Sequence, residues 1–227
     1  MQPFYIKPEW PAPPCVKAYT VLRYDHPERI TAKTNPLLHQ LPLPDEPIWI
    51  KQTHSTTVLK ALPEHREQEA DATFTHEANR ICAVLTADCL PILICHRQGT
   101  HVAAIHAGWR GLADGIIEET INALQQSPED LIAWFGPAIG PDRFAVKKEV
   151  YDAFTLPHPE AAEAFKNIGP EHWLADIYAL ARLRLCKLGI TQIYGGSFCT
   201  YQDKERFFSF RRDGALAGRM VSLIWFD

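Results

Sequence analysis

Short apolar runs rich in β-branched residues constrain the fold of this chain more than any other feature of its sequence. Five of them follow one another, at residues 48–54, 71–75, 81–87, 91–96 and 101–107. Runs of this length and composition are typical of β-strands and are too short for most helices. We therefore predict that these five runs are strands of one sheet.

A helical period replaces this pattern after residue 107. Apolar side chains recur there at intervals of three and four residues, as in Ile116, Ile117, Ile121 and Leu124. This period predicts an amphipathic helix over 112–126 that packs on the sheet and ends where a serine and a proline follow.

The remaining elements are expected on the same grounds. Helices are predicted around 147–154 and over 174–189, the second with Gly189 as its C-cap. Strands are predicted at 16–23, 131–136, 191–198 and 218–226. Strands and helices in this proportion indicate an α/β protein with a mixed sheet.

The first 47 residues differ from the rest because they hold about half of the 18 prolines. Proline favours extended and turn conformations and interrupts long helices. Apart from the predicted strand, we expect mostly loops in this Pro-rich segment. No repeat, low-complexity stretch or linker separates it from the remainder, so we predict one domain over residues 1–227.

The composition narrows the class of partner. A formal net charge of −4 gives no electrostatic reason to expect nucleic acid or an anionic membrane, so small molecules are the expected ligands. No run approaches the roughly 18 apolar residues of a membrane span, and the first residues do not resemble a secretory signal. Six cysteines without a CxxC pair indicate free thiols. A cytoplasmic protein is expected; its oligomeric state stays open.

Three side chains suited to metal binding stand at the ends of predicted strands: His54, Cys89 and His106. Catalytic zinc sites commonly use three protein ligands of these types and leave a fourth position open. Side chains at strand ends converge at one edge of a sheet, so a zinc site is predicted there. The long gaps match no local zinc motif, and a structural role for each residue is the alternative.

Residues beside the three candidate metal ligands are themselves candidates for roles in binding or catalysis. Asp88 precedes Cys89, where it is a candidate to orient a ligand, to act as an acid or base, or to form a cap. Trp109 and Arg110 lie between two glycines, which let backbone approach a ligand while the guanidinium grips phosphate or carboxylate. A core aromatic residue and a surface charge are the alternative interpretation.

Five sequence blocks appear in a characteristic order: "TADCLPILI", "HAGWRG", "GPAIGP", "CTYQDKERFFSFRRDG" and the final "GRM". In order and spacing they resemble the laccase-like polyphenol oxidase family, whose members are also described as purine nucleoside phosphorylases and as peptidoglycan editing factor. The resemblance covers about residues 48–227. It implies a layered α/β/β/α sandwich and a metal bound by His54, Cys89 and His106.

The same blocks supply candidates for substrate binding. Four residues lie within them and carry a cationic or thiol group: Arg110, Arg211, Arg212 and Cys199. The aromatic residues nearby are candidates either to wall a flat base or to fill the core: Tyr201, Phe207, Phe208 and Phe210. The chain departs from the family pattern in its N-terminal segment, at Ser55, where glycine is common, and at Ala145, where glutamate is usual.

The resemblance implies a zinc-dependent purine nucleoside enzyme, which deaminates adenosine and phosphorolyses adenosine, inosine and methylthioadenosine. One alternative is a hydrolase of peptidoglycan precursors in which Cys89 is the nucleophile and His106 the base. Another is a copper polyphenol oxidase; the chain has no H-x-H pair and only two methionines, so zinc fits better, although copper would load readily in vitro. A non-catalytic metal-binding protein is a further alternative.

Overall fold

The computed structural model describes residues 4–24 and 35–227. Its largest sheet has the strand order β12-β8-β6-β7-β4-β3. The four inner strands pair antiparallel and the two outermost strands pair parallel to their neighbours, so the predicted mixed sheet is confirmed. The bounds of its strands are β3 Val58–Lys60, β4 Ala72–Thr75, β6 Leu90–His96, β7 Val102–Ala107, β8 Leu131–Phe135 and β12 Gln192–Gly195.

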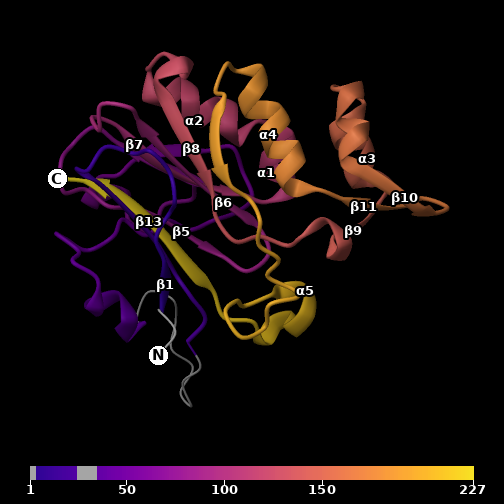
Figure 1. Cartoon of the computed structure of the whole chain (residues 1–227), viewed down its shortest axis with the longest axis horizontal. Helices are drawn as coiled ribbons and strands as arrows, with labels where there is room; N and C mark the ends of the chain where they lie inside the picture. Colours follow the sequence, from indigo (N-terminus) through magenta and orange to yellow (C-terminus); the bar gives the residue numbers. More distant parts are fainter. Residues whose placement is uncertain (1–3, 25–34) are drawn as a thin grey trace.

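Two smaller antiparallel sheets accompany it. The four-stranded sheet contains β1 Tyr5–Ile6, β2 Val16–Val21, β13 Met220–Phe226 and β5 Cys82–Thr86, in that order. The three-stranded sheet contains β10 Phe165–Gly169, β11 His172–Ala175 and β9 Ala145–Lys147. Figure 1 shows β13 running beside β5, although the two lie far apart in the sequence.

The prediction that the five apolar runs share one sheet is wrong for 81–87. This run forms β5, which pairs with β13 in the register Met220↔Thr86 to Ile224↔Cys82. Its neighbour in the sheet is therefore the last strand of the chain, which no local pattern around residue 81 can reveal.

Alternate side chains of β6 show how the layers pack. Leu93 and Cys95 point to the four-stranded sheet and share a core with Val84 and Ile224. Ile92 and Ile94 point to the opposite face, where the helices lie. Each of these β6 side chains is fully buried, as expected for a strand covered on both faces. The α/β class and the layered sandwich are confirmed.

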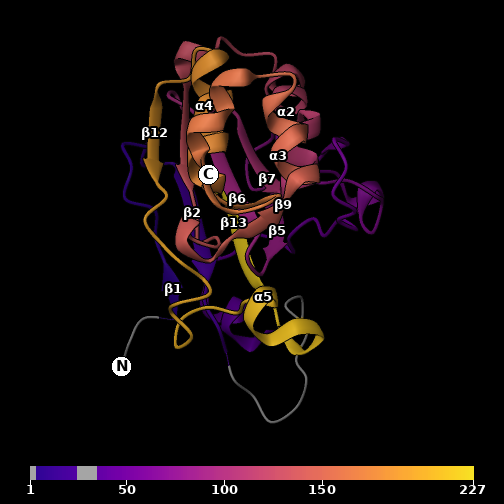
Figure 2. The same cartoon turned by 90° about the vertical axis from the view of Figure 1, so that its right-hand side faces the viewer.

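Helices cover the outer face of the six-stranded sheet (Figure 2). They are α1 Trp109–Asp114, α2 Ile116–Leu124 and α4 Ile177–Lys187. Helix α3 Lys148–Thr155 packs instead against the three-stranded sheet, where Tyr151 stacks on Trp173 of β11. On the outer face of the four-stranded sheet, the 3-10 helix Pro36–Gln40 packs its leucines against β13. A short helix, α5 Phe210–Asp213, lies apart from these layers, just before β13.

Two predicted elements differ in the structure. The helix expected over 112–126 begins earlier, at Trp109, and is broken into α1 and α2 at Gly115, whose φ of 107° is left-handed. The run 48–54 makes only isolated bridges among the described residues. There the side chain of Gln52 accepts a hydrogen bond from the N–H of Leu85 at 2.7 Å and donates one to its carbonyl oxygen at 2.8 Å. These two bonds replace the pairing of a strand.

The other predicted helices and strands form, with ends shifted by a few residues. Gly189 follows α4 with a φ of 96°, as its expected capping role requires. All six cysteines are unpaired. Among the described residues, no helix has the length and apolar character needed to span a membrane.

Candidate metal centre

His54, Cys89 and His106 meet at one point. One ligand atom of each lies within 4.8 Å of the corresponding atoms of the others. The Sγ atom of Cys89 is 3.7 Å from Nε2 of His54, and the two imidazole rings stand edge to face with centroids 4.9 Å apart. Two imidazoles and a thiol at this spacing form a suitable donor set for a metal ion.

Strand pairing explains how two of these residues come together. Pairing of β6 with β7 places Leu90 opposite Ala107 and Pro91 opposite His106. Cys89, which directly precedes β6, therefore lies beside His106. It occupies the link from β5 to β6, where the chain crosses from one sheet to the other.

His54 reaches the site from a loop and not from a strand end. Its φ of 62° is left-handed, which is uncommon for a residue with a side chain. Such a conformation persists only where the surroundings hold it. The buried carboxylate of Asp71 holds the backbone of His54 in this conformation by accepting a hydrogen bond from its N–H.

Asp71 organises both histidines, although the sequence analysis did not select it. Its Oδ1 accepts a hydrogen bond from Nδ1 of His106 at 2.7 Å and from the backbone N–H of His54 at 3.0 Å. Its Oδ2 accepts from the backbone N–H of Ser55 at 2.6 Å and from the Ser55 hydroxyl at 2.8 Å. Because Nδ1 of His106 is engaged, its Nε2 is the nitrogen available to a metal.

A signal for Asp71 was present in the sequence: it is an acidic residue at the start of a buried strand, at 71–75. Its carboxylate is fully buried, and a buried charge requires partners. Ser55, where the family pattern commonly has glycine, supplies two of those partners. This departure from the pattern therefore adds a hydrogen bond to the support of the site.

Electrostatic interactions at the site favour the thiolate of Cys89, which is the form that binds a metal. Burial alone would raise the pKa of its thiol, but hydrogen bonds from His106 and His54 outweigh burial and lower this pKa to about 6. Burial opposes a charge on His106, yet its bonds to Asp71 and Cys89 raise its pKa to about 9. Despite its own burial, the Asp71 carboxyl has a pKa well below its usual range because His106 and Ser55 donate to it.

The glycines around Trp109 make room for the His54 loop. A Cβ atom on Gly108 would lie 2.4 Å from Cδ2 of His54, and one on Gly111 would lie 2.8 Å from the carbonyl oxygen of Ser55. The sequence suggested that these glycines let the backbone approach a ligand. In the structure they let the start of α1 approach the loop of His54 and Ser55. This approach packs the start of α1 against the loop that carries a candidate ligand.

Gly108→Ala is expected to displace His54 and to weaken metal binding by the three candidate ligands about tenfold, since overpacking costs about 1–3 kcal/mol. Competition with a chromophoric chelator measures the affinity. In a His54→Ala background the clash is absent, so Gly108→Ala should then lower the free energy of unfolding far less. An equal loss of stability in both backgrounds would contradict this explanation.

The three candidate ligands lie in the wall of a cavity of about 570 Å³. Three arginines also line it, and each lies over an aromatic ring of the same cavity: Arg110 over Trp109 at 4.3 Å, Arg211 over Phe144 at 5.7 Å and Arg219 over Phe210 at 5.9 Å. Within the described part of the chain, no carboxylate forms an ion pair with any of the three. The cavity therefore presents three guanidinium groups that form no ion pair with the described residues, each stacked on an aromatic ring.

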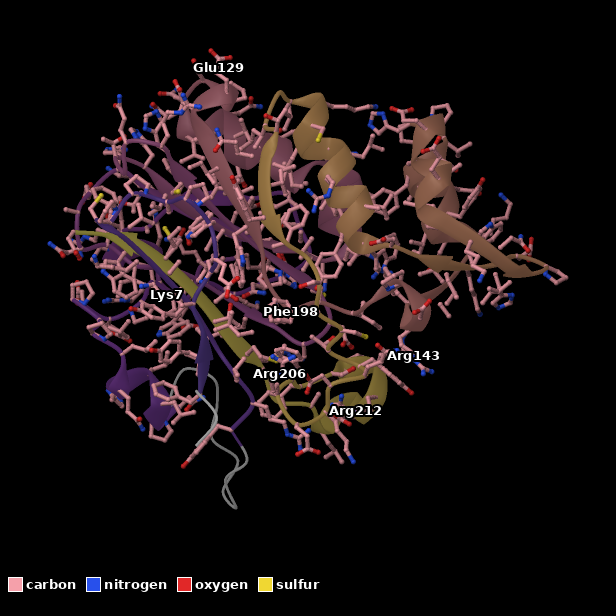
Figure 3. The ribbon with its side chains drawn as sticks, viewed as in Figure 1. Lys7, Glu129, Arg143, Phe198, Arg206 and Arg212 are labelled. Carbon is pink, nitrogen blue, oxygen red and sulfur yellow. The ribbon has the colours of Figure 1, made fainter. Side chains whose placement is uncertain are left out.

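Two predicted substrate-binding residues do not line this cavity. Arg212, a residue of α5 that Figure 3 labels, donates to the carbonyl oxygens of Thr200, Tyr201 and Phe207 and pairs with Asp213, so it holds the backbone together. Cys199 lines a separate cavity of about 270 Å³ and accepts a hydrogen bond from the N–H of Gly140 at 3.3 Å.

Arg219 lines the main cavity but was not among the predicted site residues, although its motif "GRM" was recognised. Of the aromatic candidates near residue 205, Phe210 lines the cavity and Phe207 is fully buried in the core. Sequence alone did not distinguish these two rings, because both lie in one motif.

Asp88 also lines the cavity, but its carboxylate is fully engaged. Oδ1 accepts a hydrogen bond from the hydroxyl of Thr200 at 2.5 Å. Oδ2 accepts from the hydroxyl of Ser209 at 3.0 Å and from the backbone N–H of Arg211 at 2.6 Å. These bonds tie the loop that carries Cys89 to a segment more than 100 residues later.

Known proteins are similar to this chain over most of its length. The model of a family described as multi-copper polyphenol oxidoreductase laccase matches residues 19–227. The chain is 44% identical to the purine nucleoside phosphorylase of Haemophilus influenzae, with 98% of this chain and 99% of that protein aligned. It is 43% identical to purine nucleoside phosphorylase YfiH of Escherichia coli, over 97% and 98%.

Solved structures are similar over nearly the whole chain. A crystal structure of a Neisseria meningitidis protein superposes with a TM-score of 0.91 at 43% identity, covering 99% of this chain and 100% of that one. The crystal structure of YlmD from Geobacillus stearothermophilus gives 0.90 at 25% identity, over 100% and 97%. The architecture described above is thus shared with these two proteins.

Proposed function

The chain belongs to the family described as multi-copper polyphenol oxidoreductase laccase, and we propose that within it this protein is a zinc-dependent purine nucleoside enzyme. In this proposal it cleaves purine nucleosides with phosphate and deaminates adenosine. The convergence of His54, Cys89 and His106 in the wall of a cationic, aromatic cavity carries the proposal. The name purine nucleoside phosphorylase, given to relatives more than 40% identical, supports the class of substrate.

The donor set fits zinc. Two imidazole nitrogens and a thiolate are common zinc ligands, and three protein ligands are typical of catalytic zinc sites. The lowered pKa of Cys89 supplies the thiolate at neutral pH. A bound zinc ion supplies a Lewis acid that polarises oxygen atoms and activates water.

A copper oxidase fits less well. Such enzymes use several copper ions, whereas the described residues contain a single cluster of three or more side chains able to hold a metal. Blue-copper centres commonly add an axial methionine. Met220 is fully buried in a separate core cluster, and its sulfur accepts a hydrogen bond from the N–H of Phe208.

The protein's own residues account for binding of both substrates. The guanidinium groups of Arg110, Arg211 and Arg219 have no ion-pair partner among the described residues and suit a phosphate dianion. Of the aromatic rings beneath them, Phe144 is buried, whereas Trp109 and Phe210 are partly exposed and offer flat surfaces for a purine. Asp71 holds the ring of His106 in one orientation, so that Nε2 faces the thiolate.

The direct test is incubation of metal-analysed protein with adenosine, inosine and methylthioadenosine, with and without phosphate. We expect about one zinc ion per chain, since residues 4–24 and 35–227 contain one cluster of three side chains able to hold a metal. Adenosine should yield inosine, and purine base with ribose 1-phosphate should appear only when phosphate is present. Chromatography identifies the products; absence of any nucleoside product from zinc-replete protein would overturn the proposal.

One observation favours a second function for the metal-free protein. Against the effect of burial, a hydrogen bond with His106 helps to lower the pKa of Cys89 to about 6, as expected for the nucleophile of a cysteine hydrolase with that histidine as its base. Its thiolate fraction rises as the pH increases through about 6. Alkylation of zinc-free protein by iodoacetamide should therefore speed up over that range, and zinc should protect the thiol.

Amide hydrolysis by zinc-free protein that stops on alkylation of Cys89 would support the hydrolase. Cys186, which is exposed on α4, serves as the matched control thiol because no histidine in the described part of the chain is hydrogen-bonded to it. Loss of all activity on removal of zinc would instead support the metal-dependent enzyme.

A further inference from the structure

We propose that Asp88 is a positioning residue for the substrate and takes no part in proton transfer. In this role its carboxylate fastens the α5 segment, defined as residues 207–213, to the loop that carries Cys89. The inference rests on the proposed function, because it takes the cavity beside Cys89 as the substrate pocket.

The contacts of the carboxylate are the first support. Both oxygens accept hydrogen bonds, from Thr200, Ser209 and Arg211, at 2.5 to 3.0 Å. Ser209 and Thr200 are fully buried, so water does not replace these bonds readily. A carboxylate engaged in this way acts as an anchor for two remote segments.

The backbone of Asp88 is the second support. Its φ of 90° lies in the left-handed region, which is costly for a residue with a side chain. Its carbonyl oxygen accepts a hydrogen bond from the N–H of Ile139, another residue of the cavity wall, at 3.0 Å. Through its backbone and its side chain, Asp88 joins Ile139 and the α5 segment to the loop that carries Cys89.

The segment that Asp88 fastens contributes two side chains to the cavity. Phe210 lines it with 53% of its surface exposed, and Arg211 lines it with its guanidinium over Phe144. Because α5 has only four residues, its own hydrogen bonds hold it weakly. The bond from the Arg211 N–H to Asp88 therefore adds to the contacts that fix these two side chains, beside the bonds of the Arg211 guanidinium to the carbonyl oxygens of Arg143 and Ala145.

The Asp88→Asn variant distinguishes a positioning role of Asp88 from a role in proton transfer. With its amide turned so that the oxygen faces Ser209 and Arg211, the NH₂ group donates to the Thr200 hydroxyl, which can accept. Asp88→Asn thus preserves the fastening but cannot exchange a proton at neutral pH. Asp88→Ala removes both functions.

The experiment compares Asp88→Asn and Asp88→Ala with Asp203→Asn, a matched control. Asp203 lies between Thr200 and Ser209, two of the hydrogen-bond partners of Asp88. Its carboxylate bonds Arg206, and neither Asp203 nor Arg206 lines the cavity. The readouts are kcat, KM for nucleoside and for phosphate, and zinc content. We expect Asp88→Ala to raise KM at least about tenfold with zinc retained, and Asp88→Asn to restore KM to within about threefold of the wild-type value.

The opposite result is equally clear. A fall in kcat of about 100-fold or more in Asp88→Asn, with KM and zinc unchanged, would assign acid–base chemistry to Asp88 and overturn the proposal. If Asp88→Ala does not fold, Ser209→Ala removes one of the two bonds between the α5 segment and Asp88, together with the cap on the Arg212 N–H. It should raise KM and leave kcat unchanged; an unchanged KM would also count against the fastening role.

A readout without substrate keeps this proposal separate from the proposed function. Amide hydrogen exchange over 207–213, measured on zinc-loaded protein, should accelerate in Asp88→Ala and not in Asp88→Asn or Asp203→Asn. Unchanged exchange in Asp88→Ala would overturn the fastening. A wild-type protein that turns over no nucleoside would overturn the proposed function instead, while the exchange result still holds.

Discussion

Cys89→Ala is expected to lose its bound zinc and all measurable nucleoside turnover while it keeps its fold. The thiolate is the only anionic donor among the three candidate ligands, and its loss leaves two imidazoles to hold the ion. An open zinc site needs its full ligand set both to retain the metal and to polarise its substrate. Elemental analysis and the nucleoside assay measure the two losses.

The fold should survive because Cys89 contributes little to the core. It is only partly buried and belongs to none of the hydrophobic clusters. We expect the melting temperature to fall by a few degrees, corresponding to about 1–2 kcal/mol including the lost stabilisation by metal. Cys186→Ala, an exposed cysteine on α4, is the matched control and should keep both zinc and activity.

His54→Ala distinguishes the mechanisms that Cys89→Ala cannot separate, because a hydrolase would also lose activity without Cys89. If both variants lose activity and keep full zinc, the ligand assignment is wrong. If His54→Ala remains active while Cys89→Ala does not, a dyad of Cys89 and His106 is the better explanation.

Asp71→Asn is expected to reduce zinc affinity by about 10- to 100-fold, the usual effect of losing a carboxylate behind a metal-binding histidine. Each oxygen of Asp71 accepts at least two hydrogen bonds, and every one of these donors is an N–H or O–H group. Whichever way the amide turns, its NH₂ group therefore faces donors. Both histidines lose part of their support at once.

The same substitution should lower the free energy of unfolding by roughly 3 kcal/mol, because it breaks a buried pair of hydrogen-bonded charges. Chemical denaturation of metal-free protein measures this change. Ser55→Gly, which removes a single hydroxyl donor to Asp71, gives a graded comparison with an expected cost of about 1 kcal/mol. Wild-type zinc affinity in Asp71→Asn would show that the ligands are ordered without the carboxylate.

The sequence by itself determined the α/β class, most helices and strands, and the three candidate ligands. The class follows from apolar periodicity, which depends on neighbours a few residues apart and is therefore local. The three ligands were found from their side-chain chemistry at predicted strand ends and from the resemblance of "TADC" and "HAGWRG" to a known family. Each of these signals is complete within a short stretch of chain.

The tertiary structure alone decided which remote groups meet. The place of β5 depends on pairing with the last strand, and the loop at Gln52 depends on a side chain that bonds the backbone of Leu85. Asp71 became recognisable as the support of two histidines, and Asp88 as an anchor, only when their donors were seen around them. Hydrogen bonds between segments more than 100 residues apart, such as the bond from Arg211 to Asp88, leave no periodic trace in the sequence, because their partners are neighbours in space and not along the chain.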